Sequence, residues 1–335
     1  MKNLIKNIFR TLGWILLIFV LVISFFAIQS NLRETQTRHE AAPATGKFVQ
    51  AADVEIHILE MGPADGQAIL FIHGTGAWSE FWRETMTPLA EAGYRCIAID
   101  IPPFGYSEKP STPSFGNEAQ AKRIIALMDA LEIDNAILFG HSFGGGATME
   151  TALMIPKRID ALILLDVGGL NLNLNPQPKT GTTLLEIFFE TRPIRNPILS
   201  ATATNPLLTK TLLSTMLLDP NDATDEKIKI LQRTLVLENA TNTLGDWLGY
   251  VVNVQEISRT TDPANYQNLT MPTLIVWGDS DTVIPLKEGE YLESIMPNAE
   301  LVVMKNVNHV PHVEDLETLM PIVLDFLSES VIASE

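Results

Sequence analysis

The chain has 335 residues, 46% of them hydrophobic and 19% charged, which is typical of a globular protein with a large core and excludes a disordered chain. Its formal net charge is −17 and its lysines and arginines form no cluster, so nucleic acid is not expected as a partner. The single cysteine, Cys96, excludes an intrachain disulfide.

An uncharged apolar run near the N-terminus predicts a membrane anchor. Residues 11–28 read TLGWILLIFVLVISFFAI, and three basic residues precede them. As a helix, a run of this length spans about 27 Å, close to the roughly 30 Å hydrocarbon core of a bilayer. The preceding basic residues favour a domain on the extracytoplasmic side. We therefore predict a single-pass anchor over residues 1–28 and a polar tether over residues 29–46.

A cleavable signal peptide is the competing interpretation of this segment. Its apolar region usually has about 7–15 residues and ends in a small-x-small cleavage site. Here the apolar run is longer, and Gln29-Ser30-Asn31 follows it without such a site. An uncleaved anchor is the favoured interpretation.

After residue 46, short strand-like runs alternate with helical stretches. Residues 54–59 alternate between apolar and polar positions, which predicts a half-buried antiparallel strand. The later runs are continuously apolar, as expected for strands buried on both faces. They lie at 68–72, 94–99, 136–139, 161–165, 273–277 and 301–304. Strands that alternate with helices predict an α/β fold with a mostly parallel, twisted sheet flanked by helices.

Helical stretches are expected between these strands, and the alternation breaks once. Residues 171–268 contain no clear strand, are rich in leucine and methionine, and are too numerous for a loop. We predict that they form a helical cap inserted into a core of residues 47–170 and 269–335. The helices expected in the core lie at 78–91, 118–131, 143–154, 287–296 and 314–328.

A G-x-S-x-G motif, Gly140-His141-Ser142-Phe143-Gly144, follows the apolar run 136–139 and opens a helical stretch. Five matching residues are a weak signal alone, but the strand-turn-helix setting makes it specific. Such a turn is so tight that the serine is strained and its oxygen is exposed. The motif predicts Ser142 as a catalytic nucleophile.

A serine hydroxyl needs a base within reach and a third group that orients the base. Candidates for both follow later strands. Asp279 and Asp281 come directly after the strand at 273–277, and His309 and His312 follow the strand at 301–304. The order serine, acid, histidine is the one found with this type of turn.

Four segments together resemble the α/β-hydrolase superfamily, in particular its capped, lipase- and esterase-like members. They are the oxyanion segment His73-Gly74-Thr75-Gly76, the loop Asp100-Ile101-Pro102-Pro103-Phe104-Gly105-Tyr106-Ser107, the acid turn Trp277-Gly278-Asp279-Ser280-Asp281, and the histidine loop Asn308-His309-Val310-Pro311-His312-Val313-Glu314. Pro103 and Asn308 stand where the family usually has glycine. The resemblance covers residues 47–330 and implies that Asp281 is the acid and His309 the base.

The same resemblance implies the surroundings of the nucleophile. The oxyanion hole is expected from the backbone amides of Phe143 and Thr75. Gly74, Trp78 and Phe104 are the expected substrate-binding residues, with a place in the core as the alternative for the two aromatic side chains. No metal-ligand spacing and no nucleotide-binding motif is present in the sequence, so neither a metal nor a cofactor is expected.

The predicted function is hydrolysis of a carboxylic ester through an acyl-enzyme. An apolar cap and a membrane anchor favour a lipid-like or otherwise apolar small-molecule ester as substrate. Carbon–carbon bond hydrolases, peptidases and perhydrolases of the same fold use the same three residues and stay open as alternatives. A non-catalytic surface binding protein is the alternative from a different class.

Overall fold

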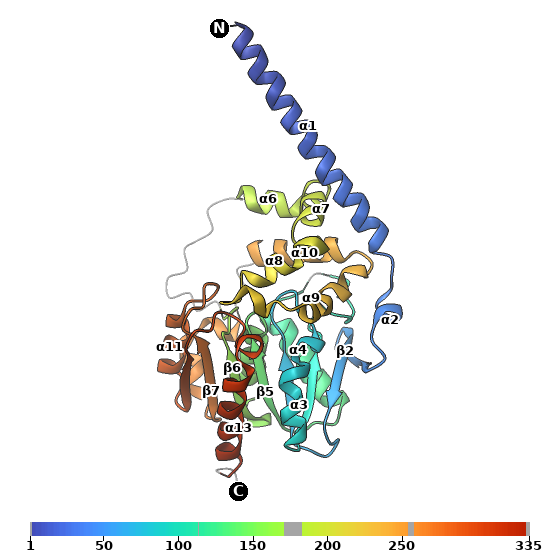
Figure 1. The fold of residues 1–335 in the computed structure, drawn as a ribbon. Helices are drawn as coiled ribbons and strands as arrows, with labels where there is room; N and C mark the ends of the chain where they lie inside the picture. The colour runs from blue at the N-terminus through green and yellow to red at the C-terminus, as the bar shows by residue number, and fades with distance from the viewer. Residues whose placement is uncertain (1, 113, 171–182, 254–257, 333–335) are drawn as a thin grey trace.

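The computed structural model describes residues 2–112, 114–170, 183–253 and 258–332 (Figure 1). The strands in this part of the chain are Gly46–Ala51 (β1), Val54–Met61 (β2), Ala68–Ile72 (β3), Arg95–Ile99 (β4), Ala136–His141 (β5), Ile159–Leu165 (β6), Thr273–Gly278 (β7) and Ala299–Met304 (β8). They form one sheet in the order β1-β2-β4-β3-β5-β6-β7-β8. β2 is antiparallel to β1 and β4, and the pairs from β4 to β8 are parallel. The predicted α/β fold is confirmed.

Two hydrophobic cores lie on the two faces of the sheet. Because successive side chains of a strand point to opposite faces, Leu70 and Ile72 of β3 enter one core, and Ile69 and Phe71 enter the other. The first core is covered by Asn117–Ala130 (α4), Gly144–Met154 (α5) and Leu286–Ile295 (α11). The second is covered by Arg83–Glu91 (α3) and Leu316–Ile332 (α13).

The predicted helices of the core lie within a few residues of the observed ones. The helix predicted at 78–91 is divided into a 3-10 turn, Ser79–Trp82, and α3, and a short additional helix, Pro311–Glu314 (α12), precedes α13. β1 was not predicted as a strand, and it pairs with β2 at the edge of the sheet.

The segment between β6 and β7 is helical where the structure describes it, and it lies over the edge of the sheet at which the parallel strands end (Figure 1). Its α-helices are Leu184–Glu190 (α6), Arg192–Ala201 (α7), Thr209–Ser214 (α8), Asp225–Gln232 (α9) and Ala240–Asn253 (α10). Short 3-10 turns connect or follow them at Pro206–Leu208, Pro220–Asp222, Arg233–Val236, Arg259–Thr261 and Pro263–Asn268. Residues 171–182 and 254–257 of the predicted cap lie outside the described residues.

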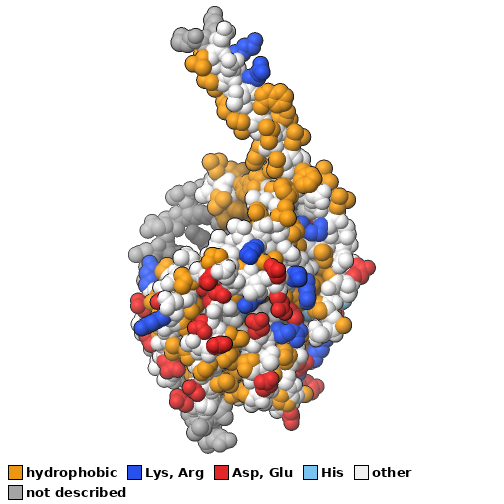
Figure 2. Space-filling view, in the orientation of Figure 1, with side chains coloured by type: hydrophobic (Ala, Val, Ile, Leu, Met, Phe, Trp, Pro, Cys, Tyr) orange, Lys and Arg blue, Asp and Glu red, His pale blue; other side chains and the backbone are white. Residues whose placement is uncertain are grey.

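The N-terminal helix, Lys2–Arg33 (α1), projects away from the body (Figure 1). Within the described residues, it is the one helix long and apolar enough to cross a membrane, and signal sequences share this property. Its apolar side chains are largely exposed along the projecting part, as Figure 2 shows. The helix continues beyond residue 28 and packs against α7.

The segment that follows α1 was expected to be a tether, but it is joined to the cap and the core by hydrogen bonds. The Thr35 and Gln36 amides donate to the Val236 carbonyl at 3.0 and 3.1 Å. The Glu34 carboxylate accepts from the Thr241 amide at 3.1 Å. Arg38 is the first residue of the short helix Arg38–Ala41 (α2), and its guanidinium forms an ion pair with the Glu55 carboxylate of β2 at 2.6 Å.

Candidate active site

Ser142 lies at the sharp turn between β5 and α5. Its φ angle is +50°, in the left-handed region that costs a non-glycine residue energy. The surrounding backbone holds this conformation: the Ser142 amide donates to the Leu165 carbonyl at 3.1 Å, and the Ser142 carbonyl accepts from Gly145 and Gly168 at 2.8 Å each. A Cβ at Gly144 would lie 2.5 Å from the Ile72 carbonyl oxygen, so β3 can approach the turn only because this position has no side chain.

One continuous chain of hydrogen bonds joins the serine to a histidine and an aspartate. His309 Nε2 lies 2.9 Å from Ser142 Oγ, and His309 Nδ1 lies 2.8 Å from Asp281 Oδ2. The other carboxylate oxygen, Asp281 Oδ1, accepts from the Val283 and Ile284 amides at 2.7 and 2.8 Å. Loops after β5, β7 and β8 thus bring together three side chains that are far apart in the sequence.

The electrostatics keep Asp281 ionised. Burial raises the pKa of this carboxyl, but the hydrogen bond and charge of His309, with the Val283 and Ile284 amides, outweigh burial, so the net pKa lies below the ordinary value. An ionised Asp281 holds the proton of neutral His309 on Nδ1, which leaves Nε2 free to accept the serine proton.

The loop that carries His309 is held from several sides. Glu314 accepts hydrogen bonds from the Asn308 and Val310 amides on either side of the histidine, at 3.0 Å each. His141 Nε2 lies 2.8 Å from the His309 carbonyl oxygen, and burial together with the nearby His309 lowers the pKa of His141 to about 3. A neutral His141 donates to this carbonyl and positions the loop.

Asp279 and His312, the alternatives to Asp281 as the acid and His309 as the base, make other contacts. Asp279 accepts from Ser280 and from the Asn306 amide, as a residue that stabilises its own turn does. His312 stacks on Trp82 with ring centroids 4.4 Å apart, and burial lowers its pKa well below the ordinary value. Neither residue contacts His309 by a hydrogen bond in the described part of the chain.

A cavity of about 540 Å³ opens in front of Ser142 and His309, between the core and the cap. Gly74, Thr75 and Phe104 line it on the core side. On the cap side the lining is mostly apolar and comes from α8 to α10 and the turns near them. The lining includes Leu212, Leu213, Met216, Leu231, Leu235, Leu237, Leu244, Trp247 and Leu248.

Two expected residues take different positions relative to the cavity. Trp78 does not line it: the indole is fully buried against Tyr106 and Leu237, and its Nε1 donates to the Ile230 carbonyl at 2.8 Å. Its contacts join the loop after β3 to the cap and do not reach the substrate space. Phe143 is the N-cap of α5, so its amide is among the N–H groups that a helix start leaves unpaired.

The comparisons with known proteins agree with this architecture. A family model described as the alpha/beta hydrolase fold matches residues 67–316. The chain belongs to the α/β-hydrolase fold family. This confirms the resemblance found in the sequence, and the chain is thereby supported as a hydrolase.

Within the α/β-hydrolases, several similar curated relatives are named as hydrolases of 2-hydroxy-6-oxo acids. The chain is 29% identical over 297 residues to the 2-hydroxy-6-oxo-6-phenylhexa-2,4-dienoate hydrolase of Burkholderia cepacia, an alignment that covers 85% of this chain and 96% of the relative. It is 28% identical over 308 residues to a 2-hydroxy-6-oxononadienedioate/2-hydroxy-6-oxononatrienedioate hydrolase of Dechloromonas aromatica, covering 88% and 98% of the two chains.

Solved structures share the fold at lower identity. A meta-cleavage product hydrolase from Pseudomonas fluorescens IP01 gives a TM-score of 0.67 at 24% identity and covers 85% of this chain and 98% of its own. A membrane phospholipase A gives a TM-score of 0.68 at 23% identity and covers 98% of this chain and 99% of its own. The second match therefore extends over α1 as well as the α/β-hydrolase core.

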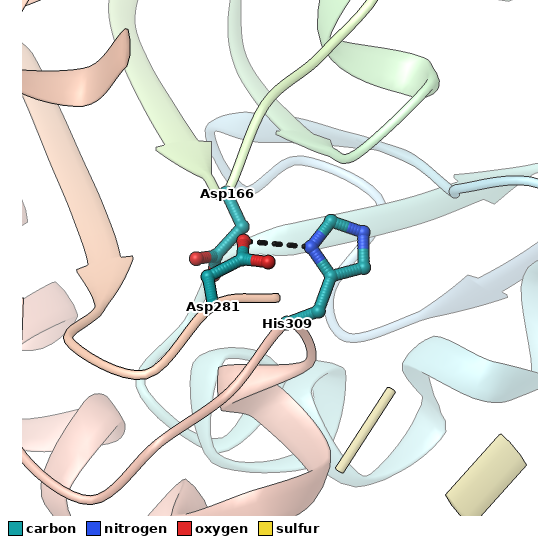
Figure 3. A group of neighbouring side chains, drawn as sticks. All are labelled: Asp166, Asp281 and His309. Atoms are coloured by element: carbon teal, nitrogen blue, oxygen red, sulfur yellow. Dashed lines mark hydrogen bonds and ion pairs between the residues drawn. The ribbon is translucent and has the colours of Figure 1, made fainter. Parts of the chain in front are cut away.

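Two residues near the site were not singled out in the sequence. Lys109, in the loop after β4, is the only lysine or arginine among the described residues that line the cavity. Asp166 follows β6 and is fully buried beside Asp281 (Figure 3). Asp166 shares with Asp281 a position after an apolar strand, but no motif in the sequence distinguishes it.

Proposed function

We propose that this α/β-hydrolase is a serine hydrolase that forms an acyl-enzyme on Ser142. The observation that carries the proposal is the hydrogen-bonded chain from Ser142 through His309 to Asp281, with Ser142 and His309 at the wall of a 540 Å³ cavity. Distances of 2.8 and 2.9 Å along this chain allow proton transfer between serine and histidine without rearrangement.

In the proposed mechanism, Ser142 Oγ attacks the carbonyl carbon of the substrate while His309 Nε2 takes the serine proton. The oxyanion that forms is held by the Phe143 and Thr75 amides. His309 then gives its proton to the leaving atom, and the acyl group stays on Ser142. Water, deprotonated by His309, attacks the acyl-enzyme, releases a carboxylic acid and restores the serine. Asp281 stabilises the imidazolium in both steps.

The leading substrate class is a carbon–carbon bond next to a ketone, in a molecule that also carries a carboxylate. The curated relatives, which align over 85% or more of the chain, support this class, and it replaces ester cleavage as the first candidate. A 2-hydroxy-6-oxo-dienoate has its carboxylate at the other end of a conjugated chain from the ketone. Lys109 is the matching cation in the cavity lining.

Ester hydrolysis is the second candidate, and the cavity itself favours it. Most of the lining side chains are aliphatic or aromatic, which suits a neutral acyl chain. The Lys109 ammonium also donates a hydrogen bond to the Glu238 carbonyl at 3.0 Å, so its charge is only partly available to a substrate.

A two-substrate comparison with Lys109→Met tests the proposal. The wild-type protein is expected to hydrolyse 2-hydroxy-6-oxo-6-phenylhexa-2,4-dienoate with a higher kcat/KM than p-nitrophenyl butyrate. Lys109→Met is expected to raise KM for the dienoate by about tenfold or more, since a charge-assisted hydrogen bond contributes about 1.5–3 kcal/mol. The KM for the neutral ester is expected to stay within about threefold.

The pH dependence gives a second readout on the same residue. Burial lowers the pKa of Lys109 to about 8, although Glu34, Asp246 and Glu238 oppose this effect. Binding of the dienoate should therefore weaken as pH rises through 8 in the wild-type protein, while Lys109→Arg should keep its affinity. Hydrolysis of the ester alone, with no turnover of the dienoate, would assign the protein to the second candidate.

We also infer that α1 anchors the protein in a membrane, with the catalytic body on the extracytoplasmic side. The helix is long enough to span the hydrocarbon core, and its apolar side chains are exposed. Hydrophobic side chains also cover the part of the body where α1 emerges, and acidic side chains lie farther away (Figure 2). Leu184 of α6 is 87% exposed, and because α6 packs against α7, which packs against α1, this side chain is expected to meet the bilayer surface.

Fractionation tests the anchor. The full-length protein is expected to stay in the membrane pellet after a carbonate wash, because a spanning helix is held by the hydrophobic effect and not by charge. Deleting residues 2–28 keeps Glu34 and the contacts of the following segment, and should release a folded, active protein into the supernatant. A wild-type protein that is soluble and has lost its first 28 or so residues would show instead that α1 is a signal sequence.

A further inference from the structure

Asp166 is a buried carboxyl that the proposed mechanism does not use. It follows β6 with a φ of +41° and is 0% exposed. Its Oδ1 accepts a hydrogen bond from the Gly278 amide at 2.9 Å, but no donor among the described residues reaches Oδ2. A buried acceptor without a donor is costly, whereas a protonated oxygen could itself donate to a neighbour.

The neighbour is Asp281. Figure 3 shows the carboxyl groups of Asp166 and Asp281 next to each other, with the His309 ring beside them and bonded to Asp281. One oxygen from each carboxyl and a ring nitrogen of His309 lie within 4.8 Å of one another. Two buried carboxyls this close disfavour the doubly ionised state, so we expect the pair to hold one proton at neutral pH.

The contacts decide which carboxyl holds the proton. Asp281 receives three hydrogen bonds, from His309 and from the Val283 and Ile284 amides, and all three favour its charged form. Asp166 receives one. Burial raises the pKa of Asp166 well above its ordinary value, the Gly278 amide opposes this effect, and the charge of Asp281 adds to it.

We propose that Asp166 is a positioning residue that extends the catalytic chain: it stays a neutral carboxylic acid and donates its O–H to the Asp281 carboxylate. The bond gives the unpartnered Asp166 oxygen an acceptor and fixes the plane of the Asp281 carboxylate, with Oδ2 toward His309. It also withdraws electron density from Asp281, so the proton that His309 receives from Ser142 stays on the imidazole. This inference rests on the proposed catalytic roles of Ser142, His309 and Asp281.

The same three side chains also have the composition of a small cation site. The direct 2.8 Å bond between Asp281 Oδ2 and His309 Nδ1 argues against this interpretation, because an ion between them would need both atoms. Addition of EDTA is therefore expected to change neither the activity nor the melting temperature. A loss of either that zinc restores would overturn the proposal.

Thermal stability against pH tests the protonation of Asp166 without any substrate. A carboxyl with a raised pKa in the folded protein binds a proton on folding at neutral pH, so its contribution to stability is full at low pH and is lost as pH rises. The side-chain amide of the Asp166→Asn variant has no proton to lose in this range, so the variant should not lose stability in this way as pH rises. Its melting temperature, relative to wild type, is expected to increase by about 4–8 °C between pH 4 and pH 8.

Asp160→Asn is the matched control, since Asp160 lies on β6, the strand that Asp166 follows, and accepts hydrogen bonds from Gln67 and Asn135 away from the site. Asp160→Asn should not show the rise in relative melting temperature above pH 5 that is expected of Asp166→Asn, and its activity should be unchanged. If Asp166→Asn shows no such rise either, Asp166 is ionised in the folded protein and the proposal fails, whatever the catalytic roles of Ser142 and His309.

Kinetics then test the positioning role. Asp166→Asn keeps an acceptor for Gly278 and a donor for Asp281, so kcat/KM should fall by about threefold or less. Asp166→Ala removes both and should lower kcat by about 30-fold or more with little change in KM, because only the transition state is affected. Equal losses in the two variants, or a loss in KM alone, would contradict the role. The alkaline limb should also differ: wild-type activity falls as Asp166 deprotonates, and that of Asp166→Asn does not.

Discussion

Replacing Ser142 with alanine is expected to lower kcat by about 10⁴-fold or more, with the fold intact. The hydroxyl is the only group at the turn that can form the acyl-enzyme, and His309 Nε2 at 2.9 Å has no other proton to take from this position. Rates on both candidate substrates measure the effect. A fluorophosphonate probe, followed by intact mass, should add one label to the wild-type protein and none to the variant.

Ser142→Gly separates catalysis from strain at the same position. It should be as inactive as Ser142→Ala, but its melting temperature should equal or exceed that of wild type. The φ of +50° costs a residue with a Cβ about 1–3 kcal/mol, and glycine adopts this angle freely. An alanine variant that still hydrolyses substrate or takes up the probe would remove Ser142 from the mechanism.

Gly278→Ala is expected to lower both stability and activity strongly. A Cβ at this position would lie 2.0 Å from the Asn308 carbonyl oxygen and 2.5 Å from that of Val307. Both atoms are backbone, so the side chain can fit only if the loop of His309 moves away from the loop of Asp281. The expected loss is about 3 kcal/mol, which in a chain of 335 residues corresponds to a melting temperature about 4–5 °C lower.

The activity of Gly278→Ala should fall about 100-fold or more in the protein that still folds, since a displacement of about 1 Å between acid and base is enough for such a loss. Gly249→Ala in α10 is the matched control. Its Cβ would lie at an ordinary 3.4 Å from Phe189, and alanine is favoured over glycine inside a helix. Differential scanning calorimetry and kcat on both variants make the comparison; a fully active, equally stable Gly278→Ala would contradict the close approach of the two loops.

The parallel strands were predictable because burial on both faces requires unbroken apolar runs. The run at 136–139 is an example: β5 lies in the middle of the sheet with every residue buried. β1 lacks this signal. It lies at the edge, only Ala51 of its residues is buried, and its sequence contains polar residues that face solvent. An edge strand is defined by its pairing with β2, which the sequence does not encode locally.

Ser142, His309 and Asp281 stood out because each occupies a motif next to a strand end, where parallel sheets collect functional side chains. Trp78 did not follow the sequence expectation, since its position depends on the cap, and Ile230, its hydrogen-bond partner, lies 152 residues away. Lys109 and Asp166 carry no motif. Their roles come from what surrounds them, namely an apolar cavity and a second carboxyl, and these surroundings exist only in the folded chain.

In the proposed membrane-anchored state, the ordered segment after α1 would fix the height of the catalytic body above the bilayer. A flexible linker of about 18 residues would have an end-to-end distance of roughly 20–25 Å and would let the body move over that range. Here hydrogen bonds join Glu34 and Gln36 to the cap, and an ion pair joins Arg38 to β2, so the segment is held along its length. Leu235, Leu237 and Ala240, which belong to the segment that these contacts hold, line the cavity. A change in the tilt of the anchor, as in a thinner or thicker bilayer, is therefore expected to be transmitted to this wall of the cavity.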